Sequence, residues 1–117
     1  MSFLDALFGP PIPAIQAAEL SEKLKNGKRP LVVDVRQPEE FRNGHIAGAK
    51  LIPLGELSRR MDKLSKDKEI VCVCATGNRS RSATKMLVRA GYNAVDMKGG
   101  MFMWQRAGLP VKKGDAA

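Results

Sequence analysis

The sequence predicts an α/β protein, a three-layer sandwich in which a mainly parallel sheet is covered by helices on both faces. Short apolar segments of strand length alternate with helical segments, and the connections between them are short. The strand segments are continuous apolar runs rich in β-branched residues, as in strands that are buried on both faces of a parallel sheet. Such alternation favours a parallel sheet with helices on each side.

The length of 117 residues fits one domain, preceded by a short arm. We expect residues 1–13 to be an N-terminal arm and residues 14–117 to form the domain. The arm combines a Pro-rich stretch with four residues on one face of a helical segment: Phe3, Leu4, Leu7 and Phe8. It either folds onto its own domain, packs on a second copy in a dimer, or docks on a partner. A membrane contact is disfavoured because the arm has no basic residue to meet anionic lipid.

In the first half of the chain, apolar residues recur at helical spacing from Ala17, and Gly27 supplies a stop. Residues 31–35 are predicted to form a buried strand. Residues 38–41 form a short helix, with Pro38 in its first turn and acidic residues at its positive end. Residues 49–52 are expected to form a second short strand.

In the second half, the apolar spacing from Leu57 to Leu64 predicts a helix, and residues 69–73 a buried strand. A longer helix follows, with the i, i+3, i+4, i+7 pattern of a helix packed on a sheet, and it ends at Gly91. Residues 93–97 are predicted to be the last strand and residues 101–106 the last helix. Ligands in such folds bind at the carboxyl ends of the strands.

Composition excludes several classes of function. The chain has 20 Lys and Arg against 12 Asp and Glu, a net charge of +8, but its basic residues form no block longer than two, and it has only six aromatic residues. We therefore expect no nucleic-acid partner and interpret the charge as a field that attracts small anions. One His and two Cys do not form a usual structural zinc site, and we expect no metal and no cofactor. No apolar run is long enough for a membrane span, and the absence of an export signal predicts the reducing cytoplasm.

The loop with the strongest chemical signal begins where the strand at residues 69–73 ends. It runs Cys74-Ala75-Thr76-Gly77-Asn78-Arg79-Ser80 and leads into the following helix. Such a loop directs successive backbone N–H groups inward, and these groups and the positive end of the helix stabilise an ionised thiol. Cys74 is thus a nucleophile candidate that needs no histidine. The alternative for Cys74 is an inert core cysteine.

The same loop resembles the active-site loop of the rhodanese-like sulfurtransferases. The resemblance extends over residues 14–112, in the order and spacing of that family's signatures. The matching segments are Asp34-Val35-Arg36, Glu40-Phe41, Gly44-His45-Ile46, Gly48-Ala49, Ile52-Pro53-Leu54, Gly99-Gly100, Trp104 and Gly108-Leu109-Pro110-Val111. The resemblance implies a rhodanese-like fold with a single domain.

The resemblance also implies that Cys74 takes a sulfane sulfur from a small anionic or protein-bound donor and carries it as a persulfide. The backbone N–H groups from Ala75 to Ser80 would hold that sulfur, and a thiophilic acceptor, either small or a protein cysteine, would remove it. Two half-reactions of this kind predict ping-pong kinetics. The alternative is a relay or binding module that passes sulfur only to a dedicated protein. The oligomeric state, monomer or dimer, stays open.

Loop length separates this chemistry from that of cysteine-dependent phosphatases, which have five residues between the nucleophile and Arg. Here four residues separate Cys74 from Arg79, and a smaller ring suits one sulfur atom better than a phosphoryl group. Many thiosulfate-using relatives have a basic or polar residue directly after the nucleophile, whereas this chain has Ala75. That difference argues against thiosulfate as the physiological donor.

Charged and polar residues outside the loop have structural interpretations. Asp34, Arg36 and Glu40 are expected to form one network that braces the loops, although Arg36 could instead line the site and meet an anionic donor. His45, in a turn, is expected to be structural rather than a proton-transfer group. Cys72 is expected to be a core residue rather than a resolving thiol, because neighbouring same-face positions of one strand suit disulfide geometry poorly.

Methionines cluster near the last helix. We expect Met97, Met101 and Met103 to be core residues beside Trp104. Part of this cluster could instead form an apolar rim for a protein partner.

Overall fold

The computed structural model describes residue 3 and residues 11–117, so most of the predicted arm (Leu4, Leu7 and Phe8) lies outside the described residues. A sheet of five parallel strands forms its centre, in the order β1-β5-β4-β2-β3. The strands are β1 (Ala14–Ile15), β2 (Leu31–Asp34), β3 (Lys50–Leu51), β4 (Glu69–Val73) and β5 (Asn93–Met97). The helices are α2 (Ala17–Leu24), α3 (Pro38–Arg42), α4 (Leu54–Arg60), the 3-10 helix η1 (Met61–Lys63), α5 (Asn78–Arg89) and α6 (Gly100–Arg106).

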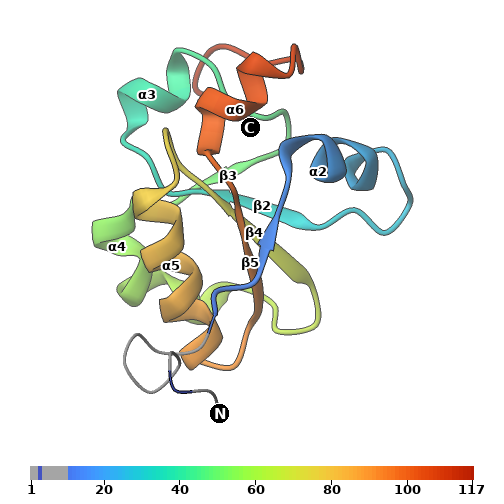
Figure 1. The fold of residues 1–117 in the computed structure, drawn as a ribbon. Coiled ribbons are helices and arrows are strands. Elements are labelled where there is room, and N and C mark those ends of the chain that lie inside the picture. The colour runs from blue at the N-terminus through green and yellow to red at the C-terminus, as the bar shows by residue number, and fades with distance from the viewer. Residues whose placement is uncertain (1–2, 4–10) are drawn as a thin grey trace.

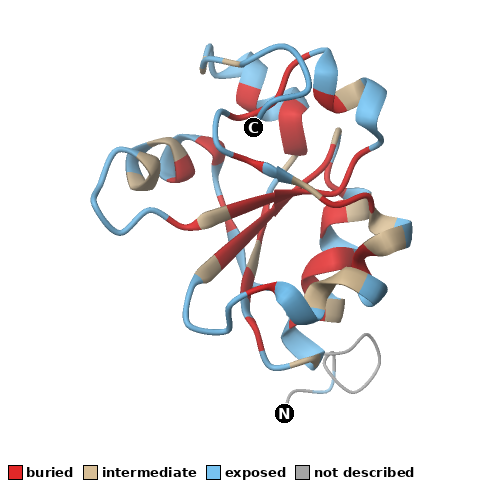
Figure 2. Ribbon diagram, turned by 180° about the vertical axis from the view of Figure 1, so that it is seen from behind, coloured by how far each residue is buried: buried red, intermediate tan, exposed pale blue. Residues whose placement is uncertain are grey.

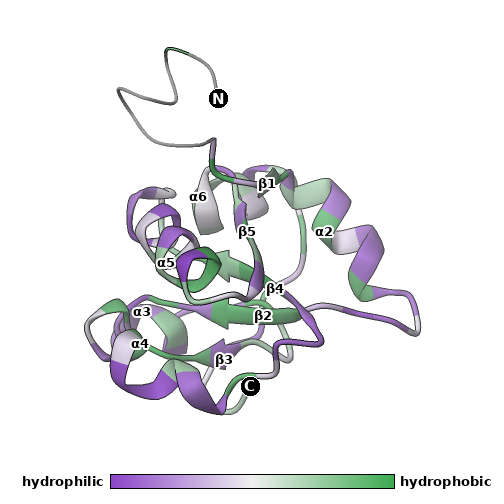
Figure 3. Ribbon diagram, turned by 90° about the horizontal axis from the view of Figure 1, so that it is seen from below, coloured by the Kyte–Doolittle hydropathy of each residue, from purple (hydrophilic) through white to green (hydrophobic). Residues whose placement is uncertain are grey.

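Helices cover both faces of the sheet, which confirms the predicted three layers (Figure 1). Leu20 of α2, Phe41 of α3 and Trp104 of α6 belong to the hydrophobic cluster on one face. Leu57 of α4 and Leu87 of α5 belong to the cluster on the other face. Buried residues concentrate in the central strands (Figure 2), and β2 and β4 are predominantly hydrophobic (Figure 3).

Successive side chains of β4 point to opposite faces of the sheet. Val71 and Val73 pack with α2, α3 and α6, whereas Ile70 and Cys72 pack with α4 and α5. Cys74, one residue beyond the strand, lies in the same cluster as Cys72. The nucleophile candidate therefore lies on the face of the sheet that α5 covers.

Two neighbouring strands deliver their carboxyl ends to one edge of the molecule. β2 and β4 are paired in parallel with Asp34 opposite Val73, and the Val35 N–H donates to the Val73 carbonyl at 2.9 Å. The segment after β2, with Arg36, and the loop after β4, with Cys74, therefore leave the sheet side by side.

The structure differs from the sequence prediction in a few places. β1 was not predicted, since two residues after a proline show no periodicity, and its pairing with β5 depends on a distant segment. The helix predicted through Leu57 and Leu64 starts earlier, at Leu54, and its last turn tightens into η1. Met97 and Met101 are buried as predicted, but Met103 is 40% exposed, so its assignment to the core was wrong. In the described part of the chain, no helix has the length and apolar character needed to cross a membrane.

Candidate active site

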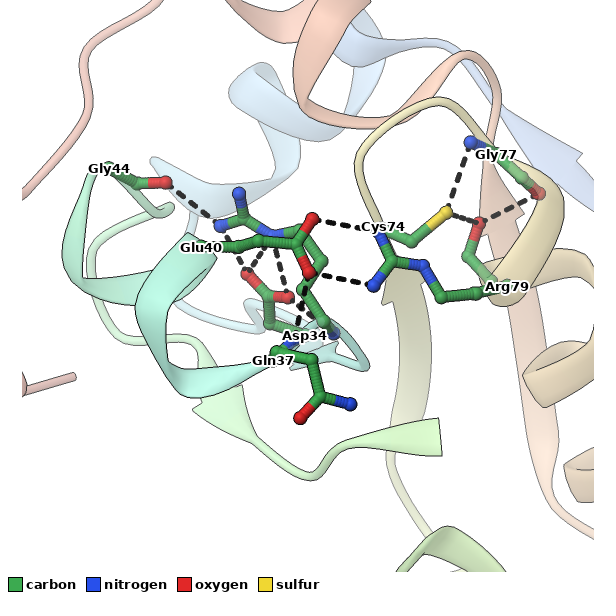
Figure 4. Close-up of polar contacts among 9 residues, drawn as sticks. Asp34, Gln37, Glu40, Gly44, Cys74, Gly77 and Arg79 are labelled. Atoms are coloured by element: carbon green, nitrogen blue, oxygen red, sulfur yellow. Dashed lines mark hydrogen bonds and ion pairs between the residues drawn. The ribbon is translucent and has the colours of Figure 1, made fainter. Parts of the chain in front are cut away.

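The thiol of Cys74 lies inside a tight loop between β4 and α5. Its Sγ accepts a hydrogen bond from the Gly77 N–H at 3.0 Å and contacts the Ser80 Oγ at 3.3 Å (Figure 4). Gly77 caps α5 with φ +112°, a conformation that L side chains rarely adopt, and so turns the chain back toward the sulfur. The N–H dipole and the start of a 12-residue helix both favour negative charge on Sγ.

The first turn of α6 fixes the other side of this loop. The Met101 N–H donates to the Cys74 carbonyl at 2.8 Å, and the Phe102 N–H donates to the Ala75 carbonyl at 3.0 Å. These carbonyl oxygens are thus bound by α6 rather than directed at the sulfur. Gly100, with φ +59°, makes this contact possible, since a Cβ there would overlap the Cys74 carbonyl oxygen and lie 2.7 Å from the Ala75 carbonyl carbon. In the sequence, Gly100 is marked only by its place in a family signature.

A buried hydroxyl connects Cys74 to a buried carboxylate. Ser80 Oγ lies 2.5 Å from Asp96 Oδ1 and 3.2 Å from the Gly77 carbonyl oxygen. Burial raises the pKa of Asp96 above its usual value, while the Ser80 hydrogen bond and two basic residues, Arg81 and Lys98, act in the opposite direction. Asp96 was not among the predicted site residues, although an acidic residue within the mostly apolar β5 was a signal for it.

Arg79 is paired with a carboxylate from α3. Its Nη1 and Nη2 donate to Glu40 Oε1 and Oε2 at 2.7 and 2.8 Å, an arrangement visible in Figure 4. The hydrogen bond from Arg79 is the largest cause that lowers the pKa of Glu40 from 4.5 to about 2. Glu40 in turn raises the pKa of Arg79. The charge predicted to attract anions is therefore largely balanced within the protein.

The remaining loop side chains face outward. Thr76 and Asn78 are exposed and Ala75 is half-buried. These three residues therefore contribute backbone groups, rather than side chains, to the interior of the loop. Thr76, Gly77 and Asn78 line a cavity of about 390 Å³. Arg81, Asp96 and Lys98 line the same cavity. Of the seven predicted loop residues, the structure brings Cys74, Gly77 and Ser80 together and directs Arg79 toward Glu40.

The charges of Asp34, Arg36 and Glu40 interact as the predicted network requires, but their hydrogen bonds fall into two pairs. Arg36 donates from Nε and Nη2 to the Asp34 carboxylate, at 3.0 and 2.8 Å, and from Nη2 to the Gly44 carbonyl oxygen at 2.8 Å. Both side chains are buried, whereas Glu40 bonds Arg79 instead. Arg36 thus ties the end of β2 to the turn at Gly44, which accounts for its burial without a donor molecule.

Cys72 is a buried core residue, as predicted, and His45 is buried and stacked on Phe41. Cys72 is fully buried as a free thiol, and burial raises its pKa to about 12. The His45 ring stacks on Phe41 with 3.6 Å between ring centroids, and its Nδ1 bonds the Phe41 carbonyl at 2.8 Å. Within the described residues, no three His, Cys, Asp or Glu side chains are grouped closely enough to hold a metal ion.

The chain is similar to known proteins over most of its length. The family model described as a rhodanese-like domain matches residues 16–107. A protein named sulfurtransferase from Allochromatium vinosum is 36% identical over 83% of this chain and 92% of its own length. A putative sulfur carrier protein from Bacillus subtilis, YrkF, is 33% identical over 72% of this chain and 45% of its own length.

The fold also has solved counterparts. The crystal structure of a rhodanese-related protein from Thermoplasma volcanium superimposes with a TM-score of 0.80 at 40% identity, covering 86% of this chain and 97% of that one.

Proposed function

This chain belongs to the rhodanese-like domain family, and we propose that it is a sulfurtransferase that carries sulfane sulfur as a persulfide on Cys74. The observation that supports this proposal best is the position of the Cys74 sulfur, which lies inside a backbone loop and accepts the Gly77 N–H at the head of α5. A thiolate stabilised in this way needs no histidine base. The only histidine, His45, is stacked in the core.

Thiosulfate illustrates how the two half-reactions balance. The Cys74 thiolate attacks the outer sulfur, an Sγ–S bond forms, the S–S bond of thiosulfate breaks, and sulfite leaves with the electron pair. Cyanide then attacks the terminal sulfur of the persulfide, thiocyanate leaves, and the Cys74 thiolate is regenerated. No external oxidant or reductant enters either step. The physiological donor carries a sulfane sulfur and is either a small molecule or a protein, and the acceptor is a thiophile. Because a nucleophilic thiol stays reduced in a reducing compartment, we assign the reaction to the cytoplasm.

Phosphatase chemistry is the less suitable use of this loop. Both terminal nitrogens of Arg79 are engaged by Glu40, so its guanidinium is not directed at an anion inside the loop. A loop arginine that binds the transferred phosphoryl group would need both terminal nitrogens free to donate to it.

Intact-protein mass spectrometry tests the proposal directly. The protein is incubated in turn with thiosulfate, mercaptopyruvate and a cysteine desulfurase that carries a persulfide. We expect one added sulfur atom, lost on addition of cyanide, with no addition in the Cys74→Ser variant. The Cys72→Ser variant is the matched control and should gain the sulfur atom like the unmodified chain. If no donor adds sulfur, or if Cys74→Ser still accepts it, the proposal is wrong.

A second candidate is a relay module that receives or passes sulfur only in contact with a partner protein. Two observations favour it: the Cys74 side chain is fully buried, and an apolar residue, Phe102, is 59% exposed on α6 directly beside the loop. The sulfur-carrier relative supports the same candidate. Turnover of thiosulfate with cyanide by the isolated protein would favour the enzyme. Sulfur loading without such turnover, followed by transfer to a protein thiol, would favour the relay.

A further inference from the structure

We propose that the proton of the Cys74 thiol passes through the Ser80 hydroxyl to the Asp96 carboxylate. This inference deepens the proposed function and rests on it, since it assigns the proton that the nucleophile must lose. It concerns a residue that the loop sequence does not contain. Asp96 lies 22 positions after Cys74, on another strand.

Strand register brings the three side chains together. β4 and β5 are parallel neighbours in which Cys72 is opposite Asp96. Cys74 follows two positions later and packs on the same face as Cys72. Ser80, in the first turn of α5, covers that face and lies within hydrogen-bond distance of both Cys74 Sγ and Asp96 Oδ1.

The Ser80 hydroxyl is suited to pass a proton because it has one hydrogen and two lone pairs. When Asp96 is ionised, Ser80 donates to Asp96 and accepts from the Cys74 thiol. When Asp96 is protonated, it donates to Ser80, and Ser80 donates to the Cys74 thiolate. The distances of 2.5 and 3.3 Å satisfy both arrangements without movement of a heavy atom.

The transfer is balanced within the protein. The S–H bond of Cys74 breaks as a proton joins the Ser80 oxygen, and the O–H bond of Ser80 breaks as its proton joins Asp96. The products are a thiolate, an unchanged hydroxyl and a neutral carboxylic acid. When the persulfide is discharged and the thiolate returns, the same proton can return from Asp96.

The surroundings of this group favour an internal acceptor. Cys74, Ser80 and Asp96 are all buried, so the Ser80 hydroxyl at 3.3 Å is a nearer proton acceptor for the thiol than bulk solvent. The titratable and charged groups around Asp96 are Arg81 on α5, Lys98 after β5 and the Cys72 thiol on β4. Burial makes Asp96 a better proton acceptor than an exposed aspartate. The Gly77 N–H donates to the same sulfur, which stabilises the thiolate once it has formed.

The test is the pH profile of thiolate content and reactivity in the full chain. Ultraviolet absorbance of the thiolate and the rate of iodoacetamide alkylation of Cys74 are measured from about pH 5 to about pH 9. Two groups that share one proton hold a nearly constant thiolate fraction while the pair retains that proton. We therefore expect a plateau across neutral pH. In Asp96→Asn the plateau should be replaced by a rate that rises about tenfold per pH unit up to a single ionisation.

Two further variants keep the outcome interpretable. Ser80→Ala retains the carboxylate but removes the hydrogen bonds that stabilise the thiolate and the protonated Asp96, so the shared proton should return to the sulfur and the plateau should be lost. Asp62→Asn removes a carboxylate that is exposed on η1 and should keep the profile of the unmodified chain. Circular dichroism and thermal unfolding identify variants that fold.

The possible failures are distinguishable. If Cys74 gains sulfur but folded Asp96→Asn and Ser80→Ala retain the plateau, or if the unmodified chain shows none, this inference is wrong and the proposed function stands. If Cys74 gains no sulfur from any donor, the proposed function is wrong, whatever the shape of the profile.

Discussion

The Glu40 carboxylate and the Arg79 guanidinium face each other through two hydrogen bonds of 2.7 and 2.8 Å, which join α3 to the first turn of α5. Each side chain is about one-third exposed, so solvent reaches the pair. The pair therefore both braces the loop and holds its positive charge close to a negative one. Separation of these two effects requires a variant that removes charge and keeps shape.

Glu40→Gln is expected to strengthen the binding of anionic donors. The amide retains one hydrogen bond to Arg79 but no longer neutralises it, so the field at the loop becomes more positive. We expect KM for thiosulfate to fall by about two- to tenfold at low salt and the difference to shrink as salt is added. Glu39→Gln removes the exposed neighbouring carboxylate on α3 and serves as the control. An equal effect of both variants would contradict the role of the pair.

The same pair predicts a pH dependence of stability. The pKa of Glu40 is lowered from 4.5 to about 2, so its contribution is present above its unfolded value and is lost as pH falls from about 4.5 toward 2. With partial exposure taken into account, we expect a contribution of about 1 kcal/mol. Urea unfolding at several pH values should show Glu40→Gln less stable near neutral pH, with the difference vanishing near pH 2. A difference that persists at low pH would assign the effect to packing.

Gly100→Ala is expected to disrupt the contact between α6 and the backbone of the Cys74 loop. Its Cβ would overlap the carbonyl of Cys74, and its φ of +59° adds backbone strain. We expect a loss of about 2 kcal/mol or more in the free energy of unfolding and slower sulfur loading of Cys74. Gly108→Ala is a matched control, since φ there is +74° but no atom lies within 4 Å of the added Cβ. It should cost about 1 kcal/mol and leave loading unchanged.

The two cysteines are expected to differ in reactivity. Burial holds the pKa of Cys72 at about 12, so near pH 8 only about one part in ten thousand is thiolate. Iodoacetamide should modify the folded protein once, at Cys74, and the Cys74→Ser variant not at all. Peptide mapping checks the site, and urea-unfolded protein should be modified twice. Modification of Cys72 in the folded chain would show that β4 is more open than the structure indicates.

The apolar surface of α6 beside the loop separates the enzyme from the relay. Phe102→Ser should leave turnover with small donors unchanged while it slows sulfur transfer from a persulfide-bearing protein, by about tenfold if the residue is a central contact. Val88→Ser is the control, because Val88 is also exposed, at 43%, but lies near the far end of α5. Equal rates for both variants would place the partner contact elsewhere.

Local patterns predicted most of the fold and singled out Cys74 as the candidate nucleophile. β2 and β4 each contain an apolar run, β5 is mostly apolar, and α5 has helical periodicity, so their own residues specify them. β1 has two residues and is a strand only because β5 lies beside it. Its existence depends on tertiary pairing, which periodicity does not record.

The partners of the loop were harder to predict for the same reason. Glu40 and Arg79 are 39 positions apart, and Asp96 reaches Ser80 from a different strand. The sequence shows which residues carry charge, but the sheet order determines which of them meet. The contact of α6 with the loop carbonyls likewise depends on a close approach that only Gly100 permits.

The edge strand has a mechanical consequence. The Asp96 N–H donates to the Pro13 carbonyl at 2.8 Å, and Ala14 is paired with Asp96 in the sheet. Tension on the chain ahead of Pro13 is therefore transmitted to the backbone of Asp96 and reaches the sulfur through the Ser80 hydroxyl. In a fusion protein, a module attached before β1 would pull on the end of the sheet beside Cys74.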